Sequence, residues 1–316
     1  MTKRPELLNG VIAGAVLLFF SLAGASAAGT KSLVCVDWLA DNLDRRDLVI
    51  LDVSEFTNYQ RGHIPGAVKA FGPWQTMNDD FLGFMIPSPD KLVKMLREFG
   101  INNNSFVVVY DEGTTAREIS KSARALWTLH SLGHEDVALL DGGFSAWKRE
   151  GRQVSRKPVA AEIGNFSGNL IPGKVTTLSG VKKKLDNDQV VFLDCRSAPE
   201  HFGQEKKSHI DRYGHLPGSR LWPAGYMTTA GLDTPSLLFR EVGVLKKMAA
   251  GVGIPADKSV EIVIYSNRGL TAALGYFVLH DLLNYQNVKI FDGSILEAAG
   301  DKDIPMTKLK WGYNNL

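Results

Sequence analysis

The chain has 316 residues, of which 44% are hydrophobic, and a formal net charge of +2. This length and apolar content are sufficient for two domains with hydrophobic cores. The small charge excludes the strongly basic surface that is typical of nucleic-acid-binding proteins. Only two cysteines are present, Cys35 and Cys195, so the fold does not depend on a disulfide framework.

The N-terminus has the pattern of a secretory signal. Lys3 and Arg4 precede an apolar run that ends at Ala25-Ser26-Ala27. This is the order of a charged region, a hydrophobic region and a small-residue cleavage site. We therefore expect a signal peptide over residues 1–27 and an exported, periplasmic mature protein. The alternative is an uncleaved segment that anchors the chain, the only case in which we expect membrane contact.

The rest of the chain contains an internal repeat of about 150 residues. The segment ILDVSEFTNYQRGHIPGA at 50–67 is matched by FLDCRSAPEHF at 192–202 together with YGHLPGS at 213–219. Likewise, LLDGG at 139–143 is matched by IFDGS at 290–294. A repeat of this size predicts tandem domains. We place them at residues 28–150 and 174–316, joined by a linker at 151–173 that is rich in glycine and proline.

Short β-branched runs alternate with longer stretches of helical spacing in each copy. In the first copy the runs are Leu48–Val53, Phe106–Tyr110 and Val137–Leu140, and helical spacing extends over Ile119–Leu132. The runs do not alternate strictly between apolar and polar residues, which is typical of strands buried on both faces. The predicted fold is therefore α/β, with two domains that each contain a mostly parallel β-sheet with helices on both faces.

The segment IVIYSNRGLT, Ile262–Thr271, predicts a binding site. A strand runs into a short polar loop and then into the start of a helix. Backbone N–H groups in such a loop, together with the helix dipole, favour a thiolate or an oxyanion. Ser266 occupies the position directly after the strand. Its hydroxyl is scarcely ionised near neutral pH and cannot carry a sulfane sulfur as a persulfide, whereas a cysteine thiolate could.

These motifs together resemble the tandem rhodaneses, the thiosulfate or mercaptopyruvate sulfurtransferase family. The similarity extends from about Leu33 to about Pro305 and includes the GHIPGA segment, the VVVYD to LDGG run and the loop before a Thr-Ala helix. In that family the first domain lacks the catalytic cysteine and the second carries it in a C-x-x-G-[VL]-T loop. Here Asp111 stands at the corresponding loop position of the first domain, as the resemblance implies. Ser266 stands at the cysteine position of the second domain, which departs from the family pattern.

The resemblance also implies a chemistry and a set of site residues. In the family the loop cysteine takes the outer sulfur of thiosulfate as a persulfide and passes it to an acceptor. For this chain it implies an anion site without that nucleophile, a pseudoenzyme that binds a small sulfur oxyanion such as thiosulfate or an exported protein partner. The site residues it implies are Ser266, at the nucleophile position, and, for anion binding, Asn267, Arg268, Gly269, Leu270, Thr271, Asp194 and Arg196. No motif for a metal or another cofactor is present, and we expect none.

Several alternatives remain open from the sequence. Arg268 could be a solvated loop charge, and Asp194 with Arg196 a surface ion pair of little energetic value. The rival function is a working sulfurtransferase or redox enzyme that uses Cys195, although strand alternation favours a buried, inert thiol there. A further alternative is that Ser266 is an engineered replacement of a cysteine.

Other residues have expected structural roles. Cys35, Trp127 and Trp147 are predicted to lie in the core. His63 and His215, in Gly-His-[Ile/Leu]-Pro-Gly turns, are expected to make orienting hydrogen bonds. Ile295 and Ala298 stand where the family usually has tryptophans, which predicts a looser wall near the site entrance.

Overall fold

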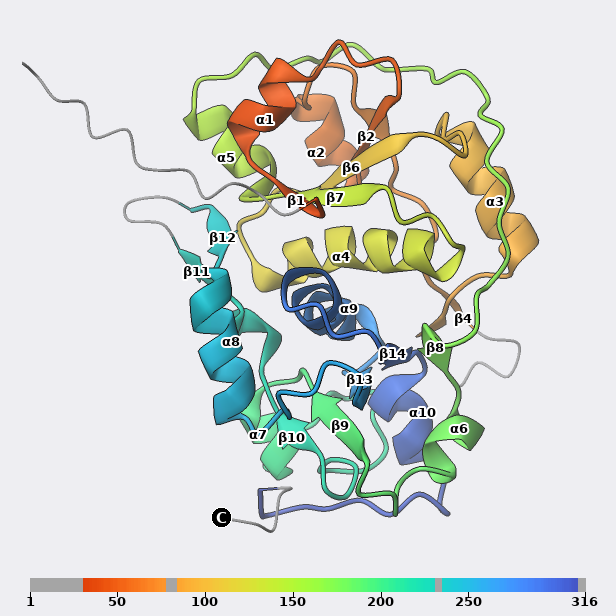
Figure 1. Ribbon diagram of the computed structural model, residues 1–316, viewed down its shortest axis with the longest axis vertical. Helices are drawn as coiled ribbons and strands as arrows, with labels where there is room; N and C mark the ends of the chain where they lie inside the picture. Colours follow the sequence, from red (N-terminus) through yellow and green to blue (C-terminus); the bar gives the residue numbers. More distant parts are fainter. Residues whose placement is uncertain (1–30, 78–83, 231–234, 312–316) are drawn as a thin grey trace, which may run out of the picture.

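The computed structural model describes residues 31–77, 84–230 and 235–311. This part of the chain forms two α/β domains, one above the other in Figure 1. The predicted signal peptide lies outside the described residues. Within the described residues, no helix is both long and apolar enough to cross a membrane.

Each domain contains a five-stranded, all-parallel sheet, and the two sheets have the same strand order. The predicted fold class is thereby confirmed. The first sheet has the order β1 (Leu33–Val34), β7 (Val137–Leu140), β6 (Phe106–Tyr110), β2 (Leu48–Asp52) and β3 (Val68–Lys69). The second has the order β8 (Val175–Thr176), β14 (Val288–Phe291), β13 (Glu261–Tyr265), β9 (Val190–Asp194) and β10 (Arg220–Leu221).

Helices cover both faces of each sheet because successive strand residues point to opposite faces and both sets are apolar. The helices are α1 (Val36–Asp41), α2 (Phe56–Arg61), α3 (Pro89–Glu98), α4 (Ala116–Ser131) and α5 (Gly143–Arg149) in the first domain, and α6 (Leu178–Lys182), α7 (Ala198–Phe202), α8 (Val242–Gly251), α9 (Leu270–Phe277) and α10 (Ser294–Gly300) in the second. A short 3₁₀ helix, η1, covers Ala224–Tyr226.

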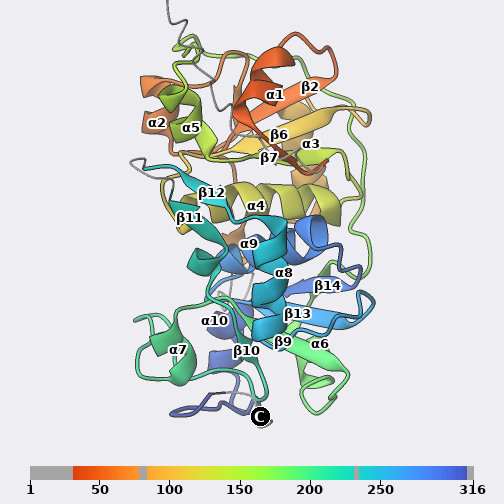
Figure 2. The same ribbon diagram turned by 60° about the vertical axis from the view of Figure 1, so that its left-hand side comes forward.

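The two domains are joined through a shared hydrophobic cluster, and each also has a separate cluster of its own. Helices α4 and α9 pack against each other between the two sheets, as both views show (Figures 1 and 2). A capping box between Thr115 and Glu118 fixes the start of α4. At its C-terminal end, α9 continues into a π-helical turn, η2 (Val278–Leu282). Buried residues of both domains therefore form a single cluster through this interface.

Each domain also extends a small antiparallel hairpin. The first consists of β4 (Thr76–Met77) and β5 (Phe84–Met85), and the second of β11 (Thr228–Ala230) and β12 (Leu237–Phe239). Residues 151–173, all described, form no helix or named strand and run along the outside of the first domain before β8 (Figure 1). Backbone hydrogen bonds, such as that from Gly164 N–H to the Arg97 carbonyl (2.8 Å), attach them to that domain.

Some predicted core positions are confirmed and others are wrong. Trp127 and Trp147 are buried, as expected. Cys35 is only half-buried, because it caps helix α1 and its Sγ accepts a hydrogen bond from Trp38 N–H. The looser wall expected at Ile295 and Ala298 is wrong, since both side chains are fully buried where α10 packs on the sheet.

Candidate functional site

The loop after β13 lies at the carboxyl edge of the central strand of the second sheet. We call residues 266–269 the cradle loop; Leu270 and Thr271 begin the helix that follows it. Gly269 ends the loop and caps α9 with φ of +72°. A Cβ at this position would lie 2.9 Å from the Asp292 carbonyl oxygen and 3.1 Å from Arg124 Nη1. Both the positive φ and the close contacts therefore require glycine here.

Ser266 is buried at the base of the cradle loop. Its backbone N–H donates to Ser294 Oγ (3.1 Å), and the Ser294 hydroxyl donates to the Phe291 carbonyl (2.8 Å). Its own Oγ has no hydrogen-bond partner within the described part of the chain. No histidine or carboxylate there is positioned to remove its proton, so the arrangement lacks the base that an activated serine needs.

Backbone hydrogen bonds fix the cradle loop to the N-terminus of α10. The carbonyl of Ser266 accepts from Ile295 N–H and that of Asn267 from Leu296 N–H, both at 3.0 Å. Since these carbonyls are directed at α10, they do not compete for the centre of the loop. The Asn267 side chain donates to Glu200 Oε1 (2.7 Å). Burial would raise the pKa of Glu200, but hydrogen bonds led by that from Asn267 outweigh it and lower the pKa.

Arg268 lies at the boundary between the two domains. Its carbonyl accepts a hydrogen bond from Gln75 Nε2 (2.6 Å), and its guanidinium carbon lies 4.7 Å from the centre of the Phe84 ring. Both contacts come from the first-domain hairpin and the residue before it. Arg268 forms no ion pair with any described carboxylate. It is half-buried against the other domain and is not a freely solvated loop charge.

Leu270 and Thr271, the first residues of α9, are half-buried. Leu270 lines a cavity of about 170 Å³ whose other walls come from the first domain, including Trp74, Lys121 and Arg124. The cavity thus lies between the domains beside the cradle loop. The two cationic side chains on its wall are both paired with carboxylates, Lys121 with Asp111 and Arg124 with Asp292.

The sequence analysis missed the ion pair beside the cradle loop. Arg124 in α4 donates to Asp292 Oδ1 (2.6 Å), and both side chains are buried. The second oxygen of Asp292 accepts from the Ile86 backbone N–H. A signal was present, because Arg124 is a charged residue on the otherwise apolar side of a predicted helix, next to Ala123 and Trp127.

Asp194 and Arg196 form a buried ion pair, which excludes the surface-pair alternative. Arg196 Nη2 donates to Asp194 Oδ2 (2.7 Å) and to the Gly214 carbonyl (2.8 Å), and His201 Nδ1 lies 3.0 Å from Asp194 Oδ2. Burial would raise the pKa of Asp194, but the charge of Arg196 and these hydrogen bonds hold it well below its usual range. None of the described hydrogen bonds joins this pair to the cradle loop, so its contact with an anion stays a prediction.

Cys195 lies against helix α9, away from the cradle loop. A Cβ on Gly275 would lie only 2.7 Å from its Sγ, and the side chain is buried. Burial and the nearby charge of Asp194 raise the pKa of the thiol well above its usual value. This is the environment of an inert structural cysteine.

The two turn histidines have structural roles. His63 Nδ1 lies 2.9 Å from the Tyr59 carbonyl, and His215 Nδ1 lies 2.6 Å from the His201 carbonyl. Burial and the neighbouring His201 lower the pKa of His215 to about 4. The expected orienting hydrogen bonds are therefore present.

The first domain has a corresponding loop after β6, with Asp111 at the position of Ser266. The Asp111 carbonyl accepts from Phe144 N–H (2.9 Å), as the Ser266 carbonyl accepts from Ile295. Its Oδ1 accepts from Glu112 N–H (2.6 Å), and Oδ2 lies 3.4 Å from Lys121 Nζ. Burial raises the pKa of Asp111 to about 6 despite the charge of Lys121. The first loop thus holds a carboxylate of its own.

Comparison with known proteins identifies the class. The family model described as a rhodanese-like domain matches residues 36–150 and again 177–300. The chain therefore belongs to the rhodanese family and contains two such domains.

Its relatives include sulfurtransferases of similar length. It is 29% identical over 294 residues to the 3-mercaptopyruvate sulfurtransferase of Escherichia coli O157:H7, covering 89% of this chain and 99% of the relative. It is 32% identical over 274 residues to a putative thiosulfate sulfurtransferase 1 of Mycobacterium bovis, covering 84% and 93%. Because these alignments span nearly whole chains, homology to the mercaptopyruvate and thiosulfate sulfurtransferases is established.

Solved structures agree with the fold. A 3-mercaptopyruvate sulfotransferase structure from Escherichia coli matches with a TM-score of 0.70 at 27% identity, covering 84% of this chain and 99% of the other. An anaerobic ergothioneine biosynthesis enzyme from Chlorobium limicola matches with a TM-score of 0.71 at 21% identity, covering 88% and 70%. The second likeness concerns the fold alone.

Proposed function

We propose that this chain is an exported rhodanese-family protein that binds a thiosulfate-like anion in its second domain without forming a persulfide. The observation that carries the proposal is Ser266, which follows the central strand β13 directly and lies at the base of the cradle loop. In the tandem rhodaneses that the sequence resembles, the nucleophilic cysteine occupies this position. We take Ser266 as the native residue that replaces it.

The chemistry of serine supports the loss of turnover. A hydroxyl stays protonated near neutral pH unless a base removes its proton, and an alkoxide does not form the sulfur–sulfur bond of a persulfide. Ser266 Oγ has no hydrogen-bond partner within the described residues, so nothing in its surroundings activates it.

Retention of anion binding is supported by charge and by the repeat. Arg268 is a cationic side chain of the cradle loop that pairs with no described carboxylate, and the helix dipole of α9 adds positive potential at Leu270. The equivalent loop of the first domain accommodates a carboxylate, that of Asp111, on a backbone N–H. The relatives are named for thiosulfate and 3-mercaptopyruvate, which are small sulfur-containing anions. A thiosulfate-like dianion, or an exported protein that carries such a group, is the ligand we propose.

The rival function, sulfur transfer through Cys195, gains no support from the geometry. The thiol is buried against Gly275, and its raised pKa leaves almost no thiolate near neutral pH. Sulfane-sulfur chemistry requires an accessible thiolate.

The test restores the missing nucleophile. Ser266→Cys protein exposed to thiosulfate should gain the mass of one sulfur atom, because the cradle loop and the helix dipole lower the pKa of a thiol there. Wild-type protein should gain none, and Cys195→Ala should not change either result. Thiosulfate:cyanide sulfur transfer by the wild type, abolished by Cys195→Ala, would establish the rival instead.

Export has a separate test. N-terminal sequencing of protein isolated from its native host should begin at Ala28, because the small residues before it form a signal-peptidase site. Recovery of chains that retain Met1 in the membrane fraction would show that the segment is an anchor.

A further inference from the structure

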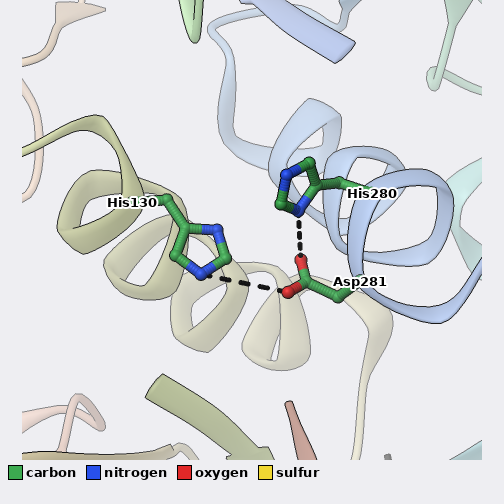
Figure 3. Close-up of side chains that lie close together, drawn as sticks. All are labelled: His130, His280 and Asp281. Carbon is green, nitrogen blue, oxygen red and sulfur yellow. Dashed lines mark hydrogen bonds and ion pairs between the residues drawn. The ribbon is translucent and has the colours of Figure 1, made fainter. Parts of the chain in front are cut away.

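A cluster of metal-ligating side chains lies at the domain interface, in a part of the molecule that the proposed anion site does not use. His130 belongs to α4 of the first domain, and His280 and Asp281 belong to the π-helical turn η2 of the second. One ligand atom from each lies within 4.8 Å of the other two. Figure 3 shows the three side chains directed toward one another across the interface.

The distances within the cluster suit a small tetrahedral ion. Metal–nitrogen and metal–oxygen bonds to zinc of about 2.0–2.2 Å place neighbouring ligand atoms roughly 3.4 Å apart. His280 Nδ1 lies 3.3 Å from Asp281 Oδ2, and His130 Nε2 lies 3.9 Å from Asp281 Oδ1. A fourth group is near, since Glu135 Oε2 lies 3.4 Å from His130 Nε2. These are two imidazoles and two carboxylates, a ligand set that zinc accepts.

An independent observation comes from His130. Its side chain is 1% exposed, yet its Nε2 has no hydrogen-bond partner among the described residues. This nitrogen faces two carboxylate oxygens, that of Glu135 at 3.4 Å and that of Asp281 at 3.9 Å, and a cation among the three would satisfy all of them. The π-helical turn that carries the other two groups is a rare conformation that is frequent at functional sites.

Lys174 supplies the cation that the cluster holds in this structure. Its ammonium donates to His280 Nε2 at 2.8 Å and lies 3.8 Å from Glu135 Oε1. Lys174 is the last residue before β8, at the end of the segment that joins the domains. The ammonium lies on Nε2, whereas Nδ1 is the nitrogen that faces Asp281, so Lys174 does not occupy the metal position but opposes a bound cation by charge repulsion.

We propose that His130, Glu135, His280 and Asp281 form an interdomain site for a divalent transition-metal ion of the zinc class. His130 and Glu135 belong to the first domain, whereas His280 and Asp281 belong to the second. A bound ion joins α4 to η2 and so fixes the two domains relative to each other. The half-exposed Glu135 gives the ion a route from solvent.

The test is a titration of untagged, metal-free protein with Zn²⁺. Calorimetry measures the binding, and thermal unfolding with increasing Zn²⁺ measures the change in Tm. We expect one ion per chain with a Kd of about 1 µM or below, and a Tm that rises with Zn²⁺ concentration. His280→Gln and Glu135→Gln, at positions that are not fully buried, should each weaken binding at least tenfold. Lys174→Gln should tighten it, because the positive charge that repels a bound cation is gone.

The control is His209→Gln, which removes an exposed histidine outside the cluster. It should leave Zn²⁺ binding unchanged. Co²⁺ should give the intense visible absorption of a four-coordinate site in the wild type and not in His280→Gln. The proposal is overturned if Zn²⁺ does not bind at one equivalent, if binding survives His280→Gln and Glu135→Gln, or if Lys174→Gln weakens it.

Discussion

Arg124 of the first domain and Asp292 of the second form a buried ion pair, with 2.6 Å between Nη1 and Oδ1, beside the glycine that ends the cradle loop. The pair connects α4, the first-domain helix at the interface, with the turn after β14. The position of the proposed anion site in the second domain therefore depends on a charge supplied by the first.

Asp292→Asn should lower the free energy of unfolding by about 3–5 kcal/mol, because it leaves the guanidinium of Arg124 buried without its counter-charge. The measurement is urea-induced unfolding monitored by tryptophan fluorescence. A matched control is Asp303→Asn, which removes an exposed carboxylate of the same domain. A loss no larger than that of the control would mean that Arg124 finds another partner.

Asp141→Asn should instead raise the free energy of unfolding at neutral pH, although Asp141 occupies the position in the first repeat that Asp292 occupies in the second. Burial raises the pKa of Asp141 to about 6, and its Oδ1 accepts from Phe239 N–H, a bond that asparagine can keep. A carboxyl whose pKa is higher in the folded state loses stabilisation as the pH rises. The variant should therefore match the wild type below about pH 4.

The advantage of Asp141→Asn should grow between about pH 4 and pH 6, to about 1–3 kcal/mol at pH 7.5. Urea unfolding midpoints at pH 4, 5, 6 and 7.5 give the profile. A difference between variant and wild type that is independent of pH would show that the ionisation of Asp141 is not its cause.

Gly269→Ala should disrupt the cradle loop. Alanine disfavours φ of +72°, and its Cβ would contact Asp292 and Arg124. Gly218 is a matched control, since it has φ of +70° but no atom within 4 Å of the position that an added Cβ would take. We expect Gly269→Ala to lose thiosulfate binding and about 2–4 kcal/mol of stability, against about 1 kcal/mol for Gly218→Ala. Equal effects would show that backbone conformation alone matters.

Arg268→Gln should weaken thiosulfate binding by about 1.5–3 kcal/mol, the usual value of a charge-assisted contact. Isothermal titration of wild type and variant at low ionic strength measures it. Lys246→Gln, an exposed charge on α8, is the control for a general change of net charge. If both variants lose the same small amount of binding free energy for thiosulfate, Arg268 does not contact the anion.

The sequence predicts the local parts of this structure well. The parallel sheets follow from apolar runs separated by helical spacing, and the cradle loop follows from a strand, a polar turn and a helix start within ten residues. Contacts between distant segments carry no such signal. The bond from Gln75 to Arg268, the pair of Arg124 with Asp292, and the gathering of His130 with His280 depend on how the two domains pack, which periodicity does not encode.

The local surroundings explain the three positions where an argument from residue type is wrong. Cys35 is apolar enough for a core, but its sulfur instead accepts a hydrogen bond at the start of α1. Ile295 and Ala298 are smaller than tryptophan, yet neighbouring side chains fill the space around them. Side-chain volume alone does not reveal a cavity, because the surrounding core adjusts to it.

The two hairpins have a consequence for the history of the chain. Phe239 N–H from the second domain binds Asp141 of the first, and Ile86 N–H from the first binds Asp292 of the second. Each repeat thus completes a turn in the other, as two subunits of a symmetric dimer would. After duplication and fusion, neither copy could be deleted or exchanged without removing a backbone donor from a carboxylate of its twin. Each domain is therefore needed for the folded structure of the other, whatever chemistry either one carries.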